Sequence, residues 1–384
     1  MGDPLFQHGV DLAVVLIVIL KTVIVFAIVL VSVLFMVVYE RKVISYMQNR
    51  VGPNRAGPDG WLQSLADGTK LFFKEALLPD QADRRIYRLA PYLSVLPAFL
   101  MFSIVPIGGT ITIAHHTTRL QLVDPPWGIL LMLMLSSISV YGMILAGWSS
   151  GSKYPLLGSV RASAQMVSYE AAMGLSVATV VVLTGALQTS AIAAAQHGGF
   201  LYRWNLVRTG VVPFVIFLIA ITAEMNRPPF DLVEAEGELA GGFNLEYSSI
   251  SFALFYLAEF MNVVTMSGLT VTLFLGGPDG PRIGGHSIGP VWFVLKVFVF
   301  LFSYVWLRAT LPRFRYDQLM DLGWKRLIPV SLGWLLVVAG FRSQHRWLGV
   351  AMFGLLIVAG VILTRSLTVG RRAAEIDANS ERVS

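Results

Sequence analysis

The chain carries carboxylates inside or directly beside apolar segments that are long enough to cross a membrane. Four of them lie within or at the ends of such segments: Glu40, Glu170, Glu224 and Glu259. A further group is clustered in one stretch: Asp231, Glu234, Glu236, Glu238 and Glu246. A charge at the centre of a lipid-facing helix costs roughly 2.5 kcal/mol or more, so such residues normally face a bundle interior and mark an ion or proton path. This pattern predicts proton chemistry inside a membrane.

The composition is that of a membrane protein, with 55% hydrophobic and 14% charged residues among 384 and a mean hydropathy of +0.67. A spanning helix needs about 20 apolar residues. Hydropathy predicts about nine spans, near 12–38, 91–107, 126–148, 164–187, 211–225, 250–275, 290–309, 327–341 and 347–364. The first apolar run is too long for a signal peptide and lacks a basic flank, so we expect the mature protein to keep it.

These spans predict an all-α polytopic helix bundle that forms one membrane domain over residues 1–364. Its long inner loops are expected at 39–90, 149–163, 226–249 and 308–326, followed by a polar cytoplasmic tail over 365–384. Lys and Arg are dense between the first two spans and absent from residues 1–11. Because cytoplasmic loops carry the positive charge, we expect the N-terminus outside and the C-terminus inside. The net charge of +6 then reflects topology and anionic lipid rather than nucleic acid.

Several kinds of cofactor chemistry lack the residues that they need. The chain has no Cys, which excludes disulfides, thiolate iron–sulfur clusters and a cysteine nucleophile. All six histidines fall outside the predicted spans on the outer side: His8, His115, His116, His197, His286 and His345. No pair of them is placed to ligate a haem inside the bundle. We also find no dinucleotide or P-loop motif, and we expect no metal site. Any redox chemistry would depend on electrons carried by another subunit.

The first inner loop predicts a helix that follows a broken stretch of chain. Gly52, Pro53, Gly57 and Pro58 interrupt the chain, and apolar residues then recur at helical spacing over 61–78. This pattern is typical of an amphipathic helix that lies in the membrane interface. A helix packed on a soluble partner would have the same pattern, and the two interpretations are compatible.

The third inner loop begins at Pro228 and Pro229, which end the fifth span. Asp231 and Glu234 have the spacing of a capping box for a new short helix. On that helix Asp231, Glu234 and Glu238 would share a face, where mutual repulsion and partial burial raise carboxylate pKa values. Such groups can exchange protons with a redox event. A solvated acidic face is the alternative, but acids in the neighbouring spans favour a proton path.

Five segments, in order, carry a resemblance that runs from Glu40 to Pro329. They are ERKVISYMQNRVGPNRAGP, LADGTKLFFKE, RASAQMVSYE, AEMNRPPFDLVEAEGELAGGFNLEYS and RATLPRFRYDQLMDLGWKRLIP. Together they resemble the H-subunit family of proton-pumping NADH-quinone oxidoreductase, respiratory complex I. The departures are Ser64 where the family often has proline, Gly241 where alanine or serine is usual, and an additional ninth span with its tail.

The resemblance implies a membrane subunit without a redox cofactor or catalytic redox residue of its own, in a bacterial plasma membrane. Its substrate would be a quinone, and flavin and iron–sulfur clusters would belong to partner subunits. The expected partners are the hydrophilic quinone-site and iron–sulfur subunits, the small and antiporter-like membrane subunits, and lipid. Matching positions nominate as tunnel-lining residues Arg41, Gln48, Arg50 and Asp67, with Trp61 and Phe243 as weaker candidates. Arg41 and Arg50 are alternatively inside anchors of the first span.

The same resemblance implies a path of acids from the quinone chamber towards the antiporter-like subunits. The implied acids are Glu170, Glu224, Asp231, Glu234, Glu236, Glu238 and Glu259, and Glu40 and Glu246 are further proton-coupling candidates. The candidate counter-charges are Arg227, Arg308, Arg313 and Arg315; docking to partner subunits is an equal interpretation of these. Lys21 and Lys296 are expected to snorkel towards the outer surface.

Three other functions remain open on the sequence. A related membrane-bound hydrogenase or other donor-linked quinone reductase shares this type of subunit. A proton-coupled secondary transporter would also explain intramembrane acids, although paired broken helices are not evident. A purely structural anchor is the third.

Overall fold

The computed structural model describes residues 4–6, 11–113, 116–198, 201–232, 241–281, 288–343 and 347–360. Glu234, Glu236 and Glu238, with the short helix expected there, lie outside these residues. The expected tail over 365–384 also lies outside them.

Within the described part of the chain, six helices are long and apolar enough to cross a membrane. They are α1 (Leu12–Met47), α4 (Gly128–Ser149), α5 (Lys153–Thr184), α10 (Ser249–Phe274), α11 (Gly289–Thr310) and the continuous helix Tyr316–Arg342. The last comprises α12 (Tyr316–Leu322), a π-helical turn η4 (Gly323–Leu327) and α13 (Ile328–Arg342). These six confirm a helical, multi-pass membrane protein.

Three further predicted spans are helical but shorter or less apolar. They correspond to α3 (Arg84–Phe102), α8 (Val211–Glu224) and the helix Trp347–Gly360. Helix α3 contains Pro91 and Pro97. Helix α8 begins after Gly210, whose φ is 83°, and ends before the Pro228–Pro229 pair. The total of nine spans therefore stays a prediction.

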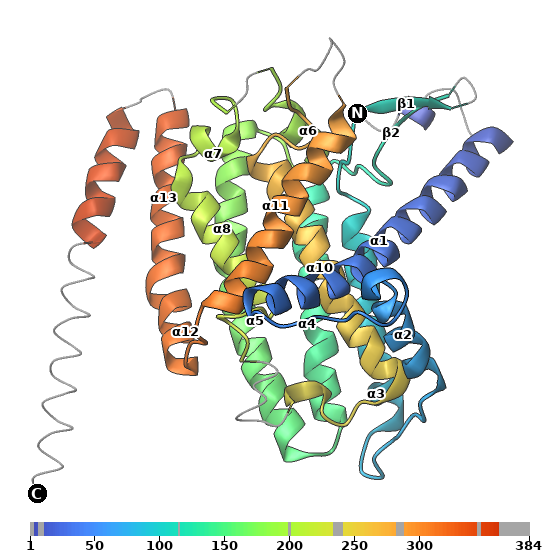
Figure 1. Ribbon diagram of the computed structural model, residues 1–384. Helices are drawn as coiled ribbons and strands as arrows, with labels where there is room; N and C mark the ends of the chain where they lie inside the picture. The colour runs from blue at the N-terminus through green and yellow to red at the C-terminus, as the bar shows by residue number, and fades with distance from the viewer. Residues whose placement is uncertain are drawn as a thin grey trace, which may run out of the picture.

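The core lies where α3, α4, α5, α8 and α10 pack against one another (Figure 1). Its largest fully buried side chains include Tyr169, Phe217, Phe260 and Phe274. Helix α1 crosses this bundle obliquely and its N-terminal part projects away from it (Figure 1). Only 17% of the most apolar window of α1 is buried, so its outward-facing Leu, Ile and Val side chains suit contact with lipid.

The first inner loop folds back onto the end of α1. It contains η2 (Pro58–Gly60) and the amphipathic helix α2 (Gln63–Phe73), which is shorter than the expected 61–78. Ser64 donates a hydrogen bond to the carbonyl of Leu34 at 2.9 Å. Gly60 has a φ of 73°, and a Cβ there would lie 2.1 Å from the Pro53 carbonyl oxygen. Phe72 and Phe73 remain exposed on α2, which suits either a lipid interface or a partner surface.

The end of the bundle opposite the first inner loop holds short elements. An antiparallel hairpin of β1 (Thr110–Ile113) and β2 (His116–Arg119) pairs Thr110 with Arg119, and the all-α prediction omitted it. Its β-branched residues explain the strands. The other short elements at this end are η1 (Pro4–Phe6), α6 (Thr189–Ala194) and α7 (Asn205–Arg208). The short helix η3 (Gly242–Asn244) lies instead at the inner end, where Gly242 approaches Gly158 near the start of α5.

Lys21 and Lys296, expected to snorkel, both bind protein groups. Lys21 donates to the Thr118 hydroxyl at 2.8 Å. Lys296 donates to the carbonyls of Leu275, Gly277 and Asp279 at 2.5 to 3.0 Å. These carbonyls follow the end of α10, where helix carbonyls lack helical partners and a cation is favourable. Lys296 therefore stabilises the end of a helix.

Candidate functional site

A buried ionic cluster joins three helices and the loop that follows α8. Arg227 Nη1 lies 3.0 Å from Glu40 Oε1 on α1, and its Nη2 lies 3.3 Å from Glu259 Oε1 on α10. Arg308, in the last turn of α11, also contacts Glu40. Glu40 and Arg227 are each only 4% exposed. A buried charge is tolerated only when it is paired, and this cluster supplies two cations and two carboxylates.

The fold holds Arg227 in place from several directions. Helix α8 ends at Glu224, and Asn226 adopts a left-handed φ of 52°, so the chain turns back into the core rather than continuing outward. The guanidinium of Arg227 then lies over the ring of Phe260, 4.4 Å from its centroid. Such cation–π contact adds to the ion pairs where water is excluded.

A cavity of about 650 Å³ lies against this cluster. Its polar lining comes from Glu40, Arg41, Gln48, Arg50 and Arg308. Its apolar lining includes Val37, Ile44, Val51, Tyr256 and Phe260. A volume of this size, lined by both apolar side chains and convergent polar groups, is in the range of small-molecule sites.

Two polar pairs border this first cavity. Arg41 Nη1 lies 2.6 Å from Asp67 Oδ2, which joins α1 to α2. Arg50 donates to the side-chain oxygen of Gln48 at 2.6 Å. Both arginines are therefore held by local acceptors while they line the cavity.

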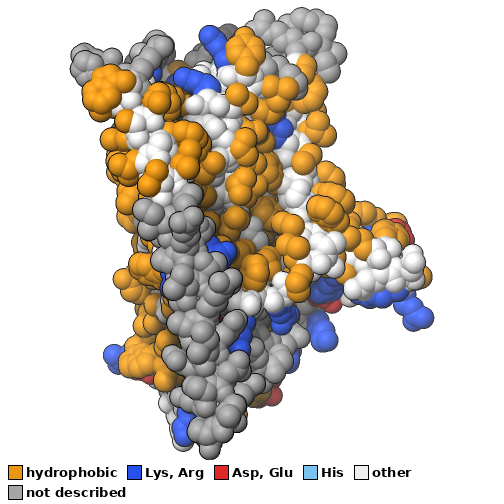
Figure 2. Space-filling model, turned by 90° about the vertical axis from the view of Figure 1, so that its left-hand side faces the viewer, with side chains coloured by type: hydrophobic (Ala, Val, Ile, Leu, Met, Phe, Trp, Pro, Cys, Tyr) orange, Lys and Arg blue, Asp and Glu red, His pale blue; other side chains and the backbone are white. Residues whose placement is uncertain are grey.

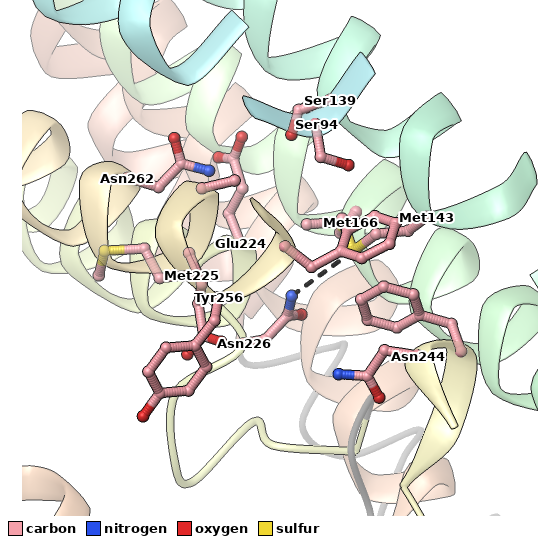
Figure 3. A pocket seen from close by; sticks show the side chains of 14 residues that line it. Ser94, Ser139, Met143, Met166, Glu224, Met225, Asn226, Asn244, Tyr256 and Asn262 are labelled. Carbon is pink, nitrogen blue, oxygen red and sulfur yellow. Dashed lines mark hydrogen bonds between the residues drawn. The ribbon is translucent and has the colours of Figure 1, made fainter. Parts of the chain in front are cut away.

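A second, smaller cavity of about 40 Å³ lies deeper in the bundle (Figure 3). Tyr256 lines both cavities, and Glu224, Glu259 and Asn262 line the second. Four buried polar atoms around it have no hydrogen-bond partner among the described residues: Ser94 Oγ, Glu224 Oε2, Asn226 Oδ1 and Asn262 Oδ1. The volume admits a few water molecules, and these atoms are suited to bind them.

Two adjacent serines on α4 extend this group of acids. Ser136 donates to Glu224 and Ser137 donates to Glu170. Glu170 on α5 and Glu224 on α8 thus contact neighbouring positions of one helix. The acids Glu259, Glu224 and Glu170 therefore form a succession that leads away from the first cavity.

The comparisons with known proteins agree on one family. The family model described as NADH dehydrogenase matches residues 20–339. The chain is 53% identical over 359 residues to the NADH-quinone oxidoreductase H subunits of Frankia alni and Frankia casuarinae, covering 89% of this chain and 78% of each relative. It is 50% identical over 337 residues to the corresponding H subunit of Streptomyces avermitilis, covering 85% of this chain and 73% of the relative. The chain belongs to the H-subunit family of NADH-quinone oxidoreductase. It is a membrane subunit of that complex.

Several of the acids and arginines predicted from the sequence are brought together in this member of the H-subunit family. Glu40, Glu259, Arg227 and Arg308 share the buried cluster. Arg313 lies 2.9 Å from Asp231, which is almost fully buried. Arg315 instead pairs with Asp317 at 3.2 Å on the surface, where both side chains are exposed. Their roles as counter-charges stay predictions.

Other predicted residues lie elsewhere. Trp61 stacks on Phe35 with 5.5 Å between ring centroids and does not line the first cavity. Phe243 lines the second cavity rather than the first. Glu246 lines neither cavity, and its backbone carbonyl accepts a hydrogen bond from the Tyr87 hydroxyl at 2.7 Å.

Tyr247, which follows Glu246 in the chain, makes a structural contact with Tyr87. Tyr247 stacks on Tyr87 at 4.0 Å and donates to the Tyr87 carbonyl at 3.0 Å. Burial raises the pKa of Tyr247 above its ordinary value, so its phenol stays protonated and keeps this bond. This pair fixes the loop after η3 against α3.

Sequence reasoning did not single out Tyr256, Asn262, Ser136 or Ser137. Neutral polar residues are common in buried helix faces, so their type alone gave no signal. Only their position against the two cavities and the acids distinguishes them. No group of three or more His, Asp or Glu residues in the described ranges is arranged to hold a metal ion.

Proposed function

We propose that this chain forms the quinone-binding tunnel of its complex and couples quinone reduction to proton translocation through its buried carboxylates. The observation that carries the proposal is the position of the Glu40–Arg227 cluster against a 650 Å³ cavity. Arg41, Gln48 and Arg50 would contact the polar quinone ring, and Val37, Ile44 and Val51 its apolar substituent. Arg41 and Arg50 also suit an anionic ring because guanidinium stays charged.

Coupling would work through charge. Reduction of a quinone to a quinol takes up two electrons and two protons, and the electrons would come from an iron–sulfur cluster of a hydrophilic partner subunit. Arg227 contacts Glu40 beside the first cavity and Glu259 beside the second. A change in charge at either carboxylate therefore alters the electrostatic energy of the other, because such interactions are strong where water is excluded.

The proton path would then continue along the acids of the bundle. Water bound in the second cavity would connect Glu259 to Glu224. The adjacent serines Ser136 and Ser137, which donate to Glu224 and Glu170 respectively, would bring these two acids into one path. The antiporter-like partner subunits would receive the resulting signal. We place the N-terminus outside and the C-terminus in the cytoplasm of a bacterial plasma membrane, as the distribution of Lys and Arg favours. The names of the relatives support NADH as the electron donor of the complex, rather than the donor of a membrane-bound hydrogenase.

Replacing Arg41 or Asp67 by Ala tests the tunnel. The Arg41–Asp67 pair holds a cavity-lining guanidinium in position, and because both side chains are partly exposed the pair itself contributes up to about 1 kcal/mol. We expect electron transfer from NADH to quinone to fall about fivefold or more, while NADH oxidation by a hydrophilic artificial acceptor is unchanged. Purified complexes with verified subunit content are assayed with both acceptors.

Lys70→Ala is the matched control, because Lys70 is exposed on the same helix α2 and lines neither cavity. It should leave both activities near wild type. Wild-type electron transfer to quinone in both the Arg41 and Asp67 variants would contradict tunnel lining, whereas equal losses with both acceptors would mean faulty assembly.

A further inference from the structure

An apolar groove of about 470 Å³ lies at the end of the bundle opposite the Glu40 cluster. Its apolar walls include Leu183, Trp334, Val337, Phe341 and Phe353. These residues come from the end of α5, from α13 and from the helix Trp347–Gly360. The helix Trp347–Gly360 follows the range that the family model matches, 20–339. The groove thus depends on a segment beyond that range.

Close helix packing builds this groove. A Cβ at Gly340 on α13 would lie 2.8 Å from the Cα of Gly349, and one at Gly333 would meet Leu356. Small residues let membrane helices approach closely. Trp334 lies edge-on to Phe353, with 6.0 Å between ring centroids, and donates to the carbonyl of Thr209 at 2.7 Å. The groove is therefore a formed feature with a fixed tryptophan in its wall.

Positive charge lies at one end of the groove. Arg208, at the end of α7, and Arg342, at the end of α13, are both exposed and both line it. No Asp or Glu is among the described residues that line it. Figure 2 faces this side and shows hydrophobic side chains along it, with Lys and Arg side chains near its upper edge. An apolar groove with cations at one end matches a lipid that has an anionic headgroup and acyl chains.

We propose that this groove binds an anionic phospholipid, with its phosphate at Arg208 and Arg342 and an acyl chain along Trp334, Val337 and Phe353. Guanidinium groups bind phosphate with directed, charge-assisted hydrogen bonds. Tryptophan is enriched at the boundary between headgroups and hydrocarbon, and Trp334 forms part of the groove wall. The site is independent of the proposed quinone tunnel, because the lining residues of the two cavities do not overlap.

The test is photocrosslinking in the intact complex, reconstituted in neutral phosphatidylcholine bilayers. The probe is phosphatidylglycerol with a diazirine in its acyl chain, compared with the same diazirine on phosphatidylcholine. We expect the anionic probe to label peptides of 328–343 and 347–360 preferentially. Arg208→Gln and Arg342→Gln should each lower this labelling about fivefold, since each basic residue near the surface contributes about that factor.

Two sets of variants control for loss of structure. Arg208→Lys and Arg342→Lys keep the charge and should retain most of the labelling. Arg203→Gln removes an exposed arginine that donates to the His197 carbonyl and does not line the groove, and it should leave labelling unchanged. Equal labelling by both probes, or labelling that survives both Gln substitutions, would show bulk lipid in the groove. Absence of labelled peptides would show that the lipid probe does not occupy the groove, and either result overturns the proposal.

Discussion

Replacing Arg227 with Met is expected to leave little of the chain in assembled, stable complex. Glu40 would stay buried with Arg308 as its one remaining cation among the contacts of the cluster, and Glu259 would lose the contact at 3.3 Å. Removing one partner of a buried ion pair typically costs about 3–5 kcal/mol, because the other charge cannot return to water. Subunit content of the purified complex and its thermal unfolding midpoint measure this loss.

Two substitutions define the comparison. Arg227→Lys keeps the charge but not the forked geometry that contacts two carboxylates, so we expect partial recovery. Arg315→Met removes an arginine whose pair with Asp317 is exposed, and such surface pairs contribute little. If the Arg227→Met complex assembled and unfolded like wild type, the cluster would not stabilise the fold, and our account of it would be wrong.

Changing Glu224 or Glu170 to Gln is expected to abolish quinone reduction and proton pumping together while leaving assembly intact. Gln keeps the shape and can still accept from Ser136 or Ser137, but it carries no charge and does not titrate. If quinone reduction and proton pumping are tightly coupled, a side chain that cannot titrate stops both reactions. We expect losses of tenfold or more in each, and partial recovery with Asp where its shorter side chain still reaches the serine.

The measurement uses reconstituted complexes of verified subunit content, in which both activities are followed. Glu75→Gln is the matched control, because Glu75 is an exposed carboxylate that lines neither cavity. Wild-type rates of both reactions in the single and double Gln variants would contradict a proton-coupling role for these acids and would favour the structural-anchor interpretation.

Hydropathy predicted the six helices that are candidate membrane spans in the described residues, but it cut the inner ends of α1 and α5 short. The first span was expected to end near residue 38, yet α1 continues to Met47. Arg41 and Lys42 are good helix formers, and the buried Glu40 is compensated by Arg227 and Arg308. Helix α5 similarly begins at Lys153 rather than near 164. A hydropathy scale counts the free-energy cost of moving a charged side chain from water into hydrocarbon. It does not include an ion-pair partner that offsets this cost.

The partners within the site depend on contacts that no local pattern encodes. Glu40 and Arg227 are separated by 187 positions, and only the packing of α1 against α10 and α11 brings the loop after α8 between them. Arg313 and Arg315 look alike in sequence, yet one reaches the buried Asp231 and the other stays at the surface. The residue types were predictable, whereas their pairing and the two cavities required the structure.

Labelling with a photoreactive quinone tests the central claim most directly. An azidoquinone with an isoprenoid tail is irradiated with the intact complex, with and without excess native quinone, and the labelled peptides are identified by mass spectrometry. The cavity against Glu40 predicts label in residues 37–53 and in the segments around Tyr256 and Arg308, removed by competition and weakened in Arg41→Ala. Label confined to other subunits, or label in this chain that native quinone does not displace, would contradict a quinone site in this chain.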